Sequence, residues 1–466
     1  MSRHLARLIL AALATFFAPA AAQEPLAFVG GTVYTGDDTP PLTDAIVLVA
    51  NGVITAVGPR AGTVVPAGSR VVDVKGRFLT PGLVDTHVHY SQTGWADGRP
   101  DARDARAEFP YEVAMAENAA HPERYHLAFL HSGVTAVFDV GGYPWTRTLG
   151  AATEHSSRAP HVAAAGALLA TYDPKLLTLP DQSQFVFPND ADDARRFVRL
   201  HKAFGSAAVK FWFIDRDKTA EELAPIVMAA GDEAQQQGLP LIVHATTLAT
   251  ARIAVDAGAH LLVHSVEDKE VDDAFVAAAK QKGTFYCPTL TVRDGYLQLH
   301  SAKISDEVRS QLDAVHPSVK ERVLRTEDKE LRAKVNSLAI EGIQKRFDLQ
   351  RTTMAKNLMK LRAGGVPIVM GTDAGNPLTL HGPSVFVEME AMQTAGMKAA
   401  EVVVASTRDA AAAMGRGKDL GRIAPGFIAD LLVLTQDPGA DARAFRSLVQ
   451  VCRGGHLHER SALLPR

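Results

Sequence analysis

Through the middle of the chain, short apolar runs alternate with longer segments of helical periodicity. Two of the helical segments, 220–238 and 248–258, end on a glycine, the residue that most readily adopts the left-handed conformation at a helix C-terminus. The apolar runs are 78–88, 134–140, 161–167, 207–213, 241–245, 260–264, 284–289 and 367–374. Eight strand–helix units predict an α/β fold, a (β/α)8 TIM barrel whose site lies at the carboxyl ends of the strands.

The two ends of the chain have a different pattern, with short β-rich runs separated by turns. These runs are 27–36, 45–58 and 71–79 near the N-terminus and 421–435 and 447–455 near the C-terminus. The pair Asn51-Gly52 inside the second run is a strong hairpin signal. We therefore expect residues 23–79 and 422–466 to form one small composite β-sandwich domain beside a barrel of residues 80–421.

One connection inside the predicted barrel is much longer than the others. It covers about 291–366 and consists mostly of charged segments with helical periodicity. Loops of this length usually carry function or form a small structure of their own. A solvated helical hairpin beside the barrel is slightly favoured over a lid or a dimer contact.

The N-terminus has the pattern of an export signal. Arg3 and Arg7 precede an apolar segment, 8–17, and three alanines stand directly before Gln23. The alternative is a membrane anchor, but the apolar segment is far shorter than the ~20 residues of a spanning helix. Residues 1–22 are therefore predicted to be a cleaved signal peptide, and the mature protein to be periplasmic or secreted without a stable membrane anchor.

Charge and cysteine content narrow the function further. The formal net charge is -3 with both signs mixed along the chain, which argues against nucleic-acid binding. Cys287 and Cys452 lie in apolar runs, and two cysteines in 466 residues do not make a disulfide scaffold, so we expect buried thiols. A homo-oligomer is compatible with this composition.

The first predicted barrel strand ends in a His-x-His pair. His87 and His89 are two residues apart, so their side chains share one face of a strand and can bind the same ion. Two solvated histidines on an edge strand are the alternative. Metal binding is favoured because Leu83 and Val84 make the strand too apolar for an edge.

Other strands end in further metal-capable side chains. They are Lys210, His244, His264 and Asp373. His260 shares a strand with His264, but four residues of strand separate the two by about 13 Å, so only His264 lies at the carboxyl end. Asp373 is either a helix cap or a ligand and proton carrier, and its place on the eighth strand favours the second role.

Lys210 is unusual because a charged amine inside a buried strand is costly. One explanation is an ion pair with a carboxylate such as Asp139, at the end of the second strand. The other is a carboxylated lysine, in which the neutral amine has captured carbon dioxide and can bridge two metal ions. The position of Lys210 between the metal-capable residues His89 and His244 favours the bridge.

With these residues the chain resembles the amidohydrolase superfamily over nearly its whole mature length. The resemblance is greatest to the imidazolonepropionase-like and Xaa-Pro dipeptidase-like branch, on the stretches AGAHLLVHSVED, GTDAG with a following His-Gly, and STRDAAAAMG. The chain departs from that branch after Lys210, where FWFIDRD replaces a glycine-rich turn, and after His244, where Ala-Thr-Thr stands in place of an aromatic residue.

The resemblance implies two divalent ions per chain. His87, His89 and Asp373 would hold one ion, His244 and His264 the other, and carboxylated Lys210 would bridge them. Zn²⁺ fits this ligand set, with Mn²⁺ or Co²⁺ as alternatives. Because such ions lower the pKa of bound water to about 7, a hydroxide is available for hydrolysis at neutral pH.

The expected reaction is hydrolysis of an amide bond in an N-acyl amino acid, a dipeptide or a related small amide, with Asp373 carrying the proton to the leaving nitrogen. Tyr90, Trp95 and His381 follow the first and last strands and are candidate substrate contacts. Hydrolysis of lactones, carbamates or phosphotriesters is the main alternative, and a mononuclear deaminase or a non-catalytic scaffold fits the ligand set less well.

Overall fold

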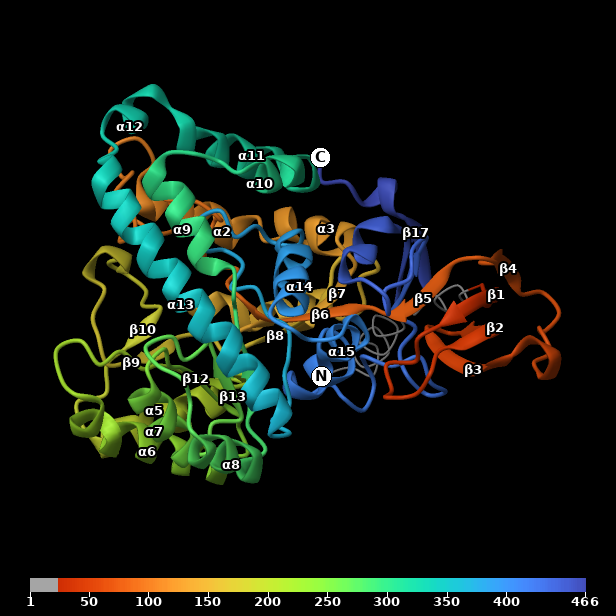
Figure 1. The fold of residues 1–466 in the computed structure, drawn as a ribbon, viewed down its shortest axis with the longest axis horizontal. Coiled ribbons are helices and arrows are strands. Elements are labelled where there is room, and N and C mark those ends of the chain that lie inside the picture. Colours follow the sequence, from red (N-terminus) through yellow and green to blue (C-terminus); the bar gives the residue numbers. More distant parts are fainter. Residues whose placement is uncertain (1–23) are drawn as a thin grey trace, which may run out of the picture.

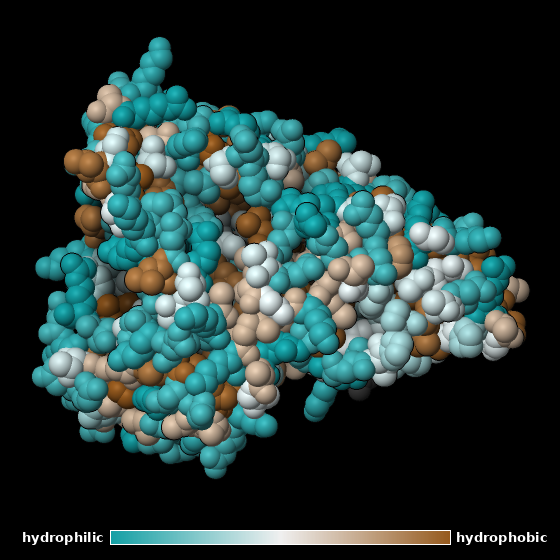
Figure 2. All heavy atoms as spheres, viewed as in Figure 1, coloured by the Kyte–Doolittle hydropathy of each residue, from teal (hydrophilic) through white to brown (hydrophobic). Residues whose placement is uncertain are grey.

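The computed structural model describes residues 24–466, and the predicted signal peptide lies outside them. Figure 1 shows a wedge-shaped molecule with a β-rich end and a larger part in which helices surround parallel strands. On the face drawn in Figure 2 the surface is mostly hydrophilic. Between residues 24 and 466, no helix combines the length and apolar character needed to cross a membrane.

The β-rich end is built from both ends of the chain. Its N-terminal strands are β1 (Leu26–Val33), β2 (Leu42–Ala50), β3 (Val53–Pro59), β4 (Arg70–Asp73) and β5 (Phe78–Pro81). Its C-terminal strands are β15 (Leu431–Leu434), β16 (Leu448–Arg453) and β17 (His456–Glu459). They form one eight-stranded sheet in the order β17-β16-β15-β5-β1-β2-β3, with β4 beside β1, and antiparallel pairing of β5 with β15 joins the two ends.

The hairpin predicted at Asn51-Gly52 is confirmed. Strands β2 and β3 pair antiparallel up to Ala50 and Val53, so only these two residues form the turn. Their φ angles are 52° and 78°, and a type I′ turn requires such positive values at both central positions. Asn and Gly are the residues that tolerate them best.

The larger part contains only parallel pairings. One sheet has the order β6 (Leu83–Val88), β7 (Val134–Asp139) and β8 (His161–Ala164). The second has the order β10 (Phe185–Val186), β9 (Leu168–Ala170), β11 (Val209–Trp212), β12 (Leu241–His244), β13 (Leu261–Val263) and β14 (Phe285–Cys287). Seven of the eight apolar runs therefore contain a strand, which confirms an α/β fold with parallel sheets.

The eighth run, 367–374, is not a regular strand. It makes isolated parallel bridges from Ile368 to Tyr286 and from Ala374 to Val88. Between them, the backbone N–H of Thr372 donates to the buried carboxylate of Asp85 (3.0 Å) instead of to a neighbouring strand. The regular strand pairings of the described residues thus form two parallel sheets, and not the single closed sheet that the sequence predicted.

Helices cover the strands as the glycine-terminated pattern predicted. Helices α5 (Ala191–Ala203), α6 (Ala220–Gln237), α7 (Leu248–Asp256) and α8 (Asp273–Lys282) pack in succession, on one side of the second sheet in Figure 1. Gly238 ends α6 with a φ of 64°. In the described part of the chain, the other α-helices outside 291–366 are α2 (Tyr111–Ala120), α3 (Glu123–His131), α4 (Leu149–Thr153), α14 (Ser384–Thr394), α15 (Ala399–Ala405) and α16 (Arg408–Ala413).

The long connection forms five α-helices. They are α9 (Val292–Ser301), α10 (Asp306–Gln311), α11 (Pro317–Leu324), α12 (Lys329–Ala333) and α13 (Ser337–Ala363). Helix α13 packs along α9 and crosses the face of the molecule drawn in Figure 1, while α10 to α12 lie at its upper edge.

Candidate metal centre

The His-x-His pair at the end of β6 forms the floor of a cavity. His87 lies in the strand and His89 directly after it, both are buried, and both line the cavity. Their ring centroids are 5.2 Å apart. Because alternate residues of a strand share a face, the two imidazoles point into the same space.

Asp373 comes to the same place from the irregular eighth segment. Its Oδ1 lies 3.2 Å from Nε2 of His87 and 3.0 Å from Nε2 of His89. The N–H of Asp373 donates to the carbonyl of His87 (2.7 Å), which fixes this segment to β6. Asp373 has a φ of 64°, a costly conformation for a residue with a side chain, and such strain is commonly retained at functional sites.

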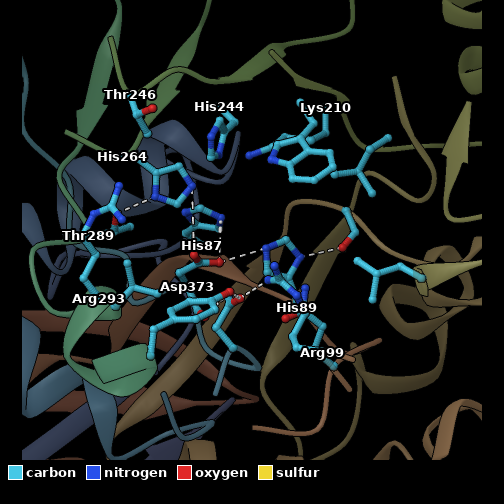
Figure 3. A pocket seen from close by; sticks show the side chains of 18 of the residues that line it. His87, His89, Arg99, Lys210, His244, Thr246, His264, Thr289, Arg293 and Asp373 are labelled. Carbon is cyan, nitrogen blue, oxygen red and sulfur yellow. Dashed lines mark hydrogen bonds and ion pairs between the residues drawn. The ribbon is translucent and has the colours of Figure 1, made fainter. Parts of the chain in front are cut away.

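Two further imidazoles, those of His264 and His244, extend this cluster. His264 follows β13, and its Nε2 lies 4.0 Å from Oδ2 of Asp373. Its ring centroid is 4.9 Å from that of His87 and 4.4 Å from that of His244, at the end of β12. Figure 3 shows these side chains converging on one space, with Lys210 beside His244. All six predicted ligands therefore line one cavity of about 220 Å³.

Several buried polar atoms of this cluster have no hydrogen-bond partner among the described residues. They are both ring nitrogens of His87, Nζ of Lys210 and Oδ1 of Asp373. An unsatisfied buried polar atom costs about 1–3 kcal/mol, so four of them in one cavity need a compensating partner. In addition, one ligand atom each from His87, His264 and Asp373 lie within 4.8 Å of one another, a spacing that fits a divalent cation.

Burial favours the neutral form of three of the imidazoles and of Lys210. It lowers the pKa of His87, His244 and His264 well below the usual value, so these rings keep a free lone pair at neutral pH. It also lowers the pKa of Lys210 to about 7, although the nearby carboxylate of Asp373 opposes the shift. A metal ligand must be deprotonated, and so must an amine that is to capture carbon dioxide.

Hydrogen bonds behind the cluster orient two of the imidazoles. Nδ1 of His89 donates to the carbonyl of Gly141 (2.6 Å), so Nε2 is the ring nitrogen that faces Asp373. Nδ1 of His264 bonds Oγ1 of Thr289 (2.8 Å). Bonds of this kind fix the tautomer and orientation of ligating histidines.

The described residues contain no ion pair between Lys210 and Asp139, which was the alternative explanation for the buried lysine. Asp139, its proposed partner, accepts the backbone N–H groups of Tyr90 (2.8 Å) and Gly141 (3.1 Å) instead. Nζ of Lys210 forms no salt bridge or hydrogen bond to any described residue. His260, as expected, lies away from this cavity, where its Nε2 bonds the carbonyl of Ala413 (3.0 Å).

The three candidate substrate contacts lie elsewhere. None of Tyr90, Trp95 and His381 lines the cavity, and all three are buried. Trp95 donates its indole N–H to Oγ1 of Thr326 (3.0 Å). His381 stacks on Tyr125 at 3.9 Å, and its Nε2 bonds the carbonyl of His89 (3.1 Å). Of the three, His381 contacts a predicted ligand directly, through this bond to the backbone of His89.

Other side chains of the cavity were not predicted. They are Gln92, Arg99, Leu168, Leu177, Gln184, Phe185, Trp212, Thr246, Ser265, Glu267, Thr289, Val292, Arg293, Tyr296, Met354 and Asn376. Trp212 could have been found, because it stands two residues after Lys210 and so shares its strand face. Most of the others come from loops. Loop sequences have no periodic pattern from which the direction of a side chain could be predicted.

The helical connection is part of the cavity, which corrects the favoured view of a hairpin beside the barrel. Helix α9 contributes Val292, Arg293 and Tyr296, and α13 contributes Met354. Arg293 pairs with the carboxylate of Glu267 through Nε (2.7 Å) and a second, shorter contact.

The sequence model of the family described as "Amidohydrolase family" matches residues 78–454. The chain belongs to this family. It is 27% identical to an imidazolonepropionase of Chromobacterium violaceum over 406 residues (83% of this chain, 84% of the relative) and 24% identical to an ochratoxinase of Aspergillus niger over 474 residues (93% and 87%). The solved structure of a Xaa-Pro dipeptidase with bound methionine superposes with a TM-score of 0.71 at 20% identity, over 94% of this chain and 100% of that one.

These comparisons confirm the resemblance to the imidazolonepropionase-like and Xaa-Pro dipeptidase-like branch. This amidohydrolase is therefore an enzyme, a hydrolase that acts on C–N bonds. The superfamily is metal-dependent, and the cluster around Asp373 is where this chain could bind a metal.

Proposed function

We propose that this amidohydrolase cleaves the amide bond of a small molecule, an N-acyl amino acid, a dipeptide or a related amide. The observation that carries the proposal is the position of the Asp373 carboxylate, within 3.2 Å of two imidazoles at the floor of the cavity. Amide cleavage requires a proton at a poor leaving nitrogen, and a carboxylate in this position can supply it. The names of the dipeptidase and imidazolonepropionase relatives point to C–N bonds in small substrates.

We propose two divalent ions, Zn²⁺ in the first place, with Mn²⁺ or Co²⁺ as alternatives. His87, His89 and Asp373 would hold one ion, His244 and His264 the other, and Lys210 would bridge them as a carbamate. Bound ions of this kind lower the pKa of water to about 7 and polarise the carbonyl of the substrate. The neutral imidazoles and the unpaired Nζ of Lys210 support this assignment.

The protein side chains orient the reactants and move the proton. Asp373 accepts the proton of the attacking water and passes it to the leaving nitrogen, a step typically worth about 10²–10⁴-fold in rate. The backbone N–H of Asp373 donates to the carbonyl of His87, and this bond holds the carboxylate above the floor. Asn376 strengthens this turn, because its Nδ2 donates to the carbonyl of Asp373 (3.0 Å).

We infer that the parallel strands close into a (β/α)8 barrel, with a composite β-sandwich domain of residues 23–79 and 422–466. Two backbone bonds beyond the regular pairings support closure: Ala207 N–H to the carbonyl of Ala164 (2.9 Å) and Thr86 N–H to that of Met370 (3.2 Å). An experimental structure in which segment 161–170 does not pair with β11, or segment 367–374 does not lie between β14 and β6, would contradict closure.

A hydrolysis screen tests the reaction class. Metal-replete protein would be assayed against N-acyl amino acids, dipeptides, cyclic amides, carbamates, lactones and phosphotriesters, with ammonia release from aminopurines as the deaminase control. We expect turnover of at least one amide class. Strong turnover of lactones or phosphotriesters with none of any amide would overturn the proposal, and a metal-free, inactive protein would favour a scaffold.

We also propose that the enzyme is exported and processed between Ala22 and Gln23. The basic and apolar segments before the alanines support this. N-terminal sequencing of the exported protein is expected to start at Gln23. A start upstream of Leu8 would contradict processing and favour an anchor.

A further inference from the structure

One wall of the cavity beside the metal centre is apolar, and half of its side chains are aromatic. It is made by Leu168, Leu177, Phe185 and Trp212, from the segment between β9 and the end of β11. Val292 and Met354 of α9 and α13 are the aliphatic side chains that the helical connection adds to the same cavity. A substrate that reaches the ligand cluster therefore meets apolar surface next to it.

Trp212 links this wall to the ligand cluster. It is the last residue of β11, and its strand register pairs it with His244 on one side and Ala170 on the other. The indole ring lies 6.1 Å from the His244 ring at an interplanar angle of 80°. Trp212 is partly exposed, and it lines the cavity. Its accessible surface therefore faces the space where a substrate would lie.

Phe185 holds the second aromatic position. Its ring is 5.2 Å from that of Trp212 and tilted by 32°. Phe185 is itself buried in a cluster with Tyr111, Tyr143 and Leu177, so its ring is fixed by packing. Aromatic groups pair favourably at ring distances of about 4.5–7 Å in tilted and edge-to-face geometries, and a third ring can extend such a pair.

The two arginines of the cavity stand outside this wall and already have partners. Arg99 pairs with Asp101 (2.7 Å), and Arg293 pairs with Glu267. The polar neighbour within the wall is Gln184, whose Nε2 donates to Oη of Tyr111 (2.8 Å) and to the carbonyl of Leu177 (3.0 Å). The wall thus favours an uncharged apolar group over a charged one.

We propose that Trp212 and Phe185 form a subsite for an aromatic group next to the scissile amide, and that Trp212 determines specificity. The inference rests on the proposed amide hydrolysis and names its substrate class. An aromatic side chain gains both burial and ring contacts there, whereas a methyl group is too small to exclude water from the apolar wall.

Two substrate pairs test the subsite and separate the acyl side from the amine side. The amine-side pair is N-acetylphenylalanine and N-acetylalanine, and the acyl-side pair is N-phenylacetylglycine and N-acetylglycine. In at least one pair we expect a roughly tenfold or larger kcat/KM for the aromatic member, the size expected when a hydrophobic pocket is filled. Equal kcat/KM within both pairs would overturn the subsite and leave amide hydrolysis standing.

Variants of Trp212 test whether this residue produces the preference for aromatic substrates. Trp212→Leu is expected to raise KM for the preferred aromatic substrate and to lower the ratio of its kcat/KM to that of the small counterpart. Trp212→Phe is expected to keep most of this ratio. Trp145→Leu is the matched control, because Trp145 packs on the same apolar cluster but does not line the cavity. An equal loss of preference in Trp212→Leu and Trp145→Leu would indicate a structural effect and contradict the proposal.

Binding provides a readout that does not depend on turnover. Calorimetry would compare phenylacetate with acetate, and phenylalanine with alanine, on the full-length mature enzyme and on its Trp212→Leu variant. We expect tighter binding of at least one aromatic compound, lost in Trp212→Leu and retained in Trp145→Leu. If no amide is hydrolysed but this difference holds, the proposed function fails and the subsite stands; if no aromatic compound binds more tightly, the subsite fails.

Discussion

Oδ1 of Asp373 lies 3.0 Å from Nε2 of His89. Through this contact, the irregular segment 367–374 meets the end of β6 at the candidate metal centre. Nδ1 of the same imidazole donates to the carbonyl of Gly141. His89 is therefore held from behind while its second nitrogen faces the carboxylate. In the proposed mechanism, both the metal centre and the proton transfer depend on Asp373.

Asp373→Asn is expected to lower turnover by about 10²–10⁴-fold while the protein still folds, because an amide cannot carry the proton. The variant would be assayed after metal loading, with its fold checked by circular dichroism. Asp215→Asn is the control, since Asp215 follows β11 without lining the cavity. Near-wild-type turnover of metal-loaded Asp373→Asn would remove this residue from catalysis.

Gly371→Ala is expected to damage the metal centre, because an added Cβ would lie 2.6 Å from Sγ of Cys287 and 2.9 Å from Cβ of His87. We expect lower metal content and a lower melting temperature. Gly342→Ala in α13, where a Cβ meets nothing within 4 Å, is expected to stabilise the protein by about 0.5–1 kcal/mol. Normal metal content in Gly371→Ala would show that this close packing does not position His87.

Glu388 gives the folded protein a testable pH dependence. Its buried carboxyl accepts the N–H groups of Leu290 (2.7 Å) and Thr291 (3.1 Å), and burial raises its pKa from 4.5 to about 7. The folded state thus binds this proton more tightly than the unfolded state. The contribution to stability is therefore full below about pH 4.5 and is lost as the pH rises through about 7.

The test compares wild type with Glu388→Gln by denaturant unfolding between about pH 5 and pH 8, a range that spans the raised pKa. The stability advantage of the wild type over the variant is expected to shrink as the pH rises. Glu390→Gln is the control, because Glu390 lies in the same helix, is only partly buried and pairs with Arg446. An advantage of the wild type over Glu388→Gln that grows with pH would contradict the raised pKa.

Trp95→Phe is expected to leave KM and kcat close to those of the wild type, because the Trp95 ring does not line the cavity. The variant loses the bond from its indole N–H to Thr326, so unfolding should cost about 0.5–1.5 kcal/mol less. Steady-state kinetics and urea unfolding measure the two effects. A large rise in KM with unchanged stability would restore Trp95 as a substrate contact.

Much of the fold could be predicted because it depends on local patterns. The Asn51-Gly52 turn, the glycine cap of α6 and the buried thiols of Cys287 and Cys452 all follow from short stretches of sequence. The irregular eighth segment could not be predicted in this way. It depends on the side chain of Asp85, far away in sequence, which replaces a strand partner at Thr372.

The residues of the candidate site likewise fall into those that local sequence patterns predict and those that they do not. Because a barrel site lies at the carboxyl ends of its strands, the sequence alone placed His87 and His264 together, and both line the cavity. Arg99 and Arg293 also reach the cavity, but they come from a loop and from the helical connection, where sequence spacing does not fix direction. Trp212 is intermediate. The strand face on which it lies could be predicted, but its ring contact with Phe185 could not.

The two-metal centre bridged by Lys210 is the central claim, and elemental analysis of purified protein tests it most directly. Protein produced with ample zinc and bicarbonate is expected to contain about two ions per chain, as in binuclear hydrolytic sites. Lys210→Ala is expected to lose at least one of them together with amide hydrolysis. About one ion per chain in the wild type, with the metal content of Lys210→Ala unchanged, would contradict the bridge.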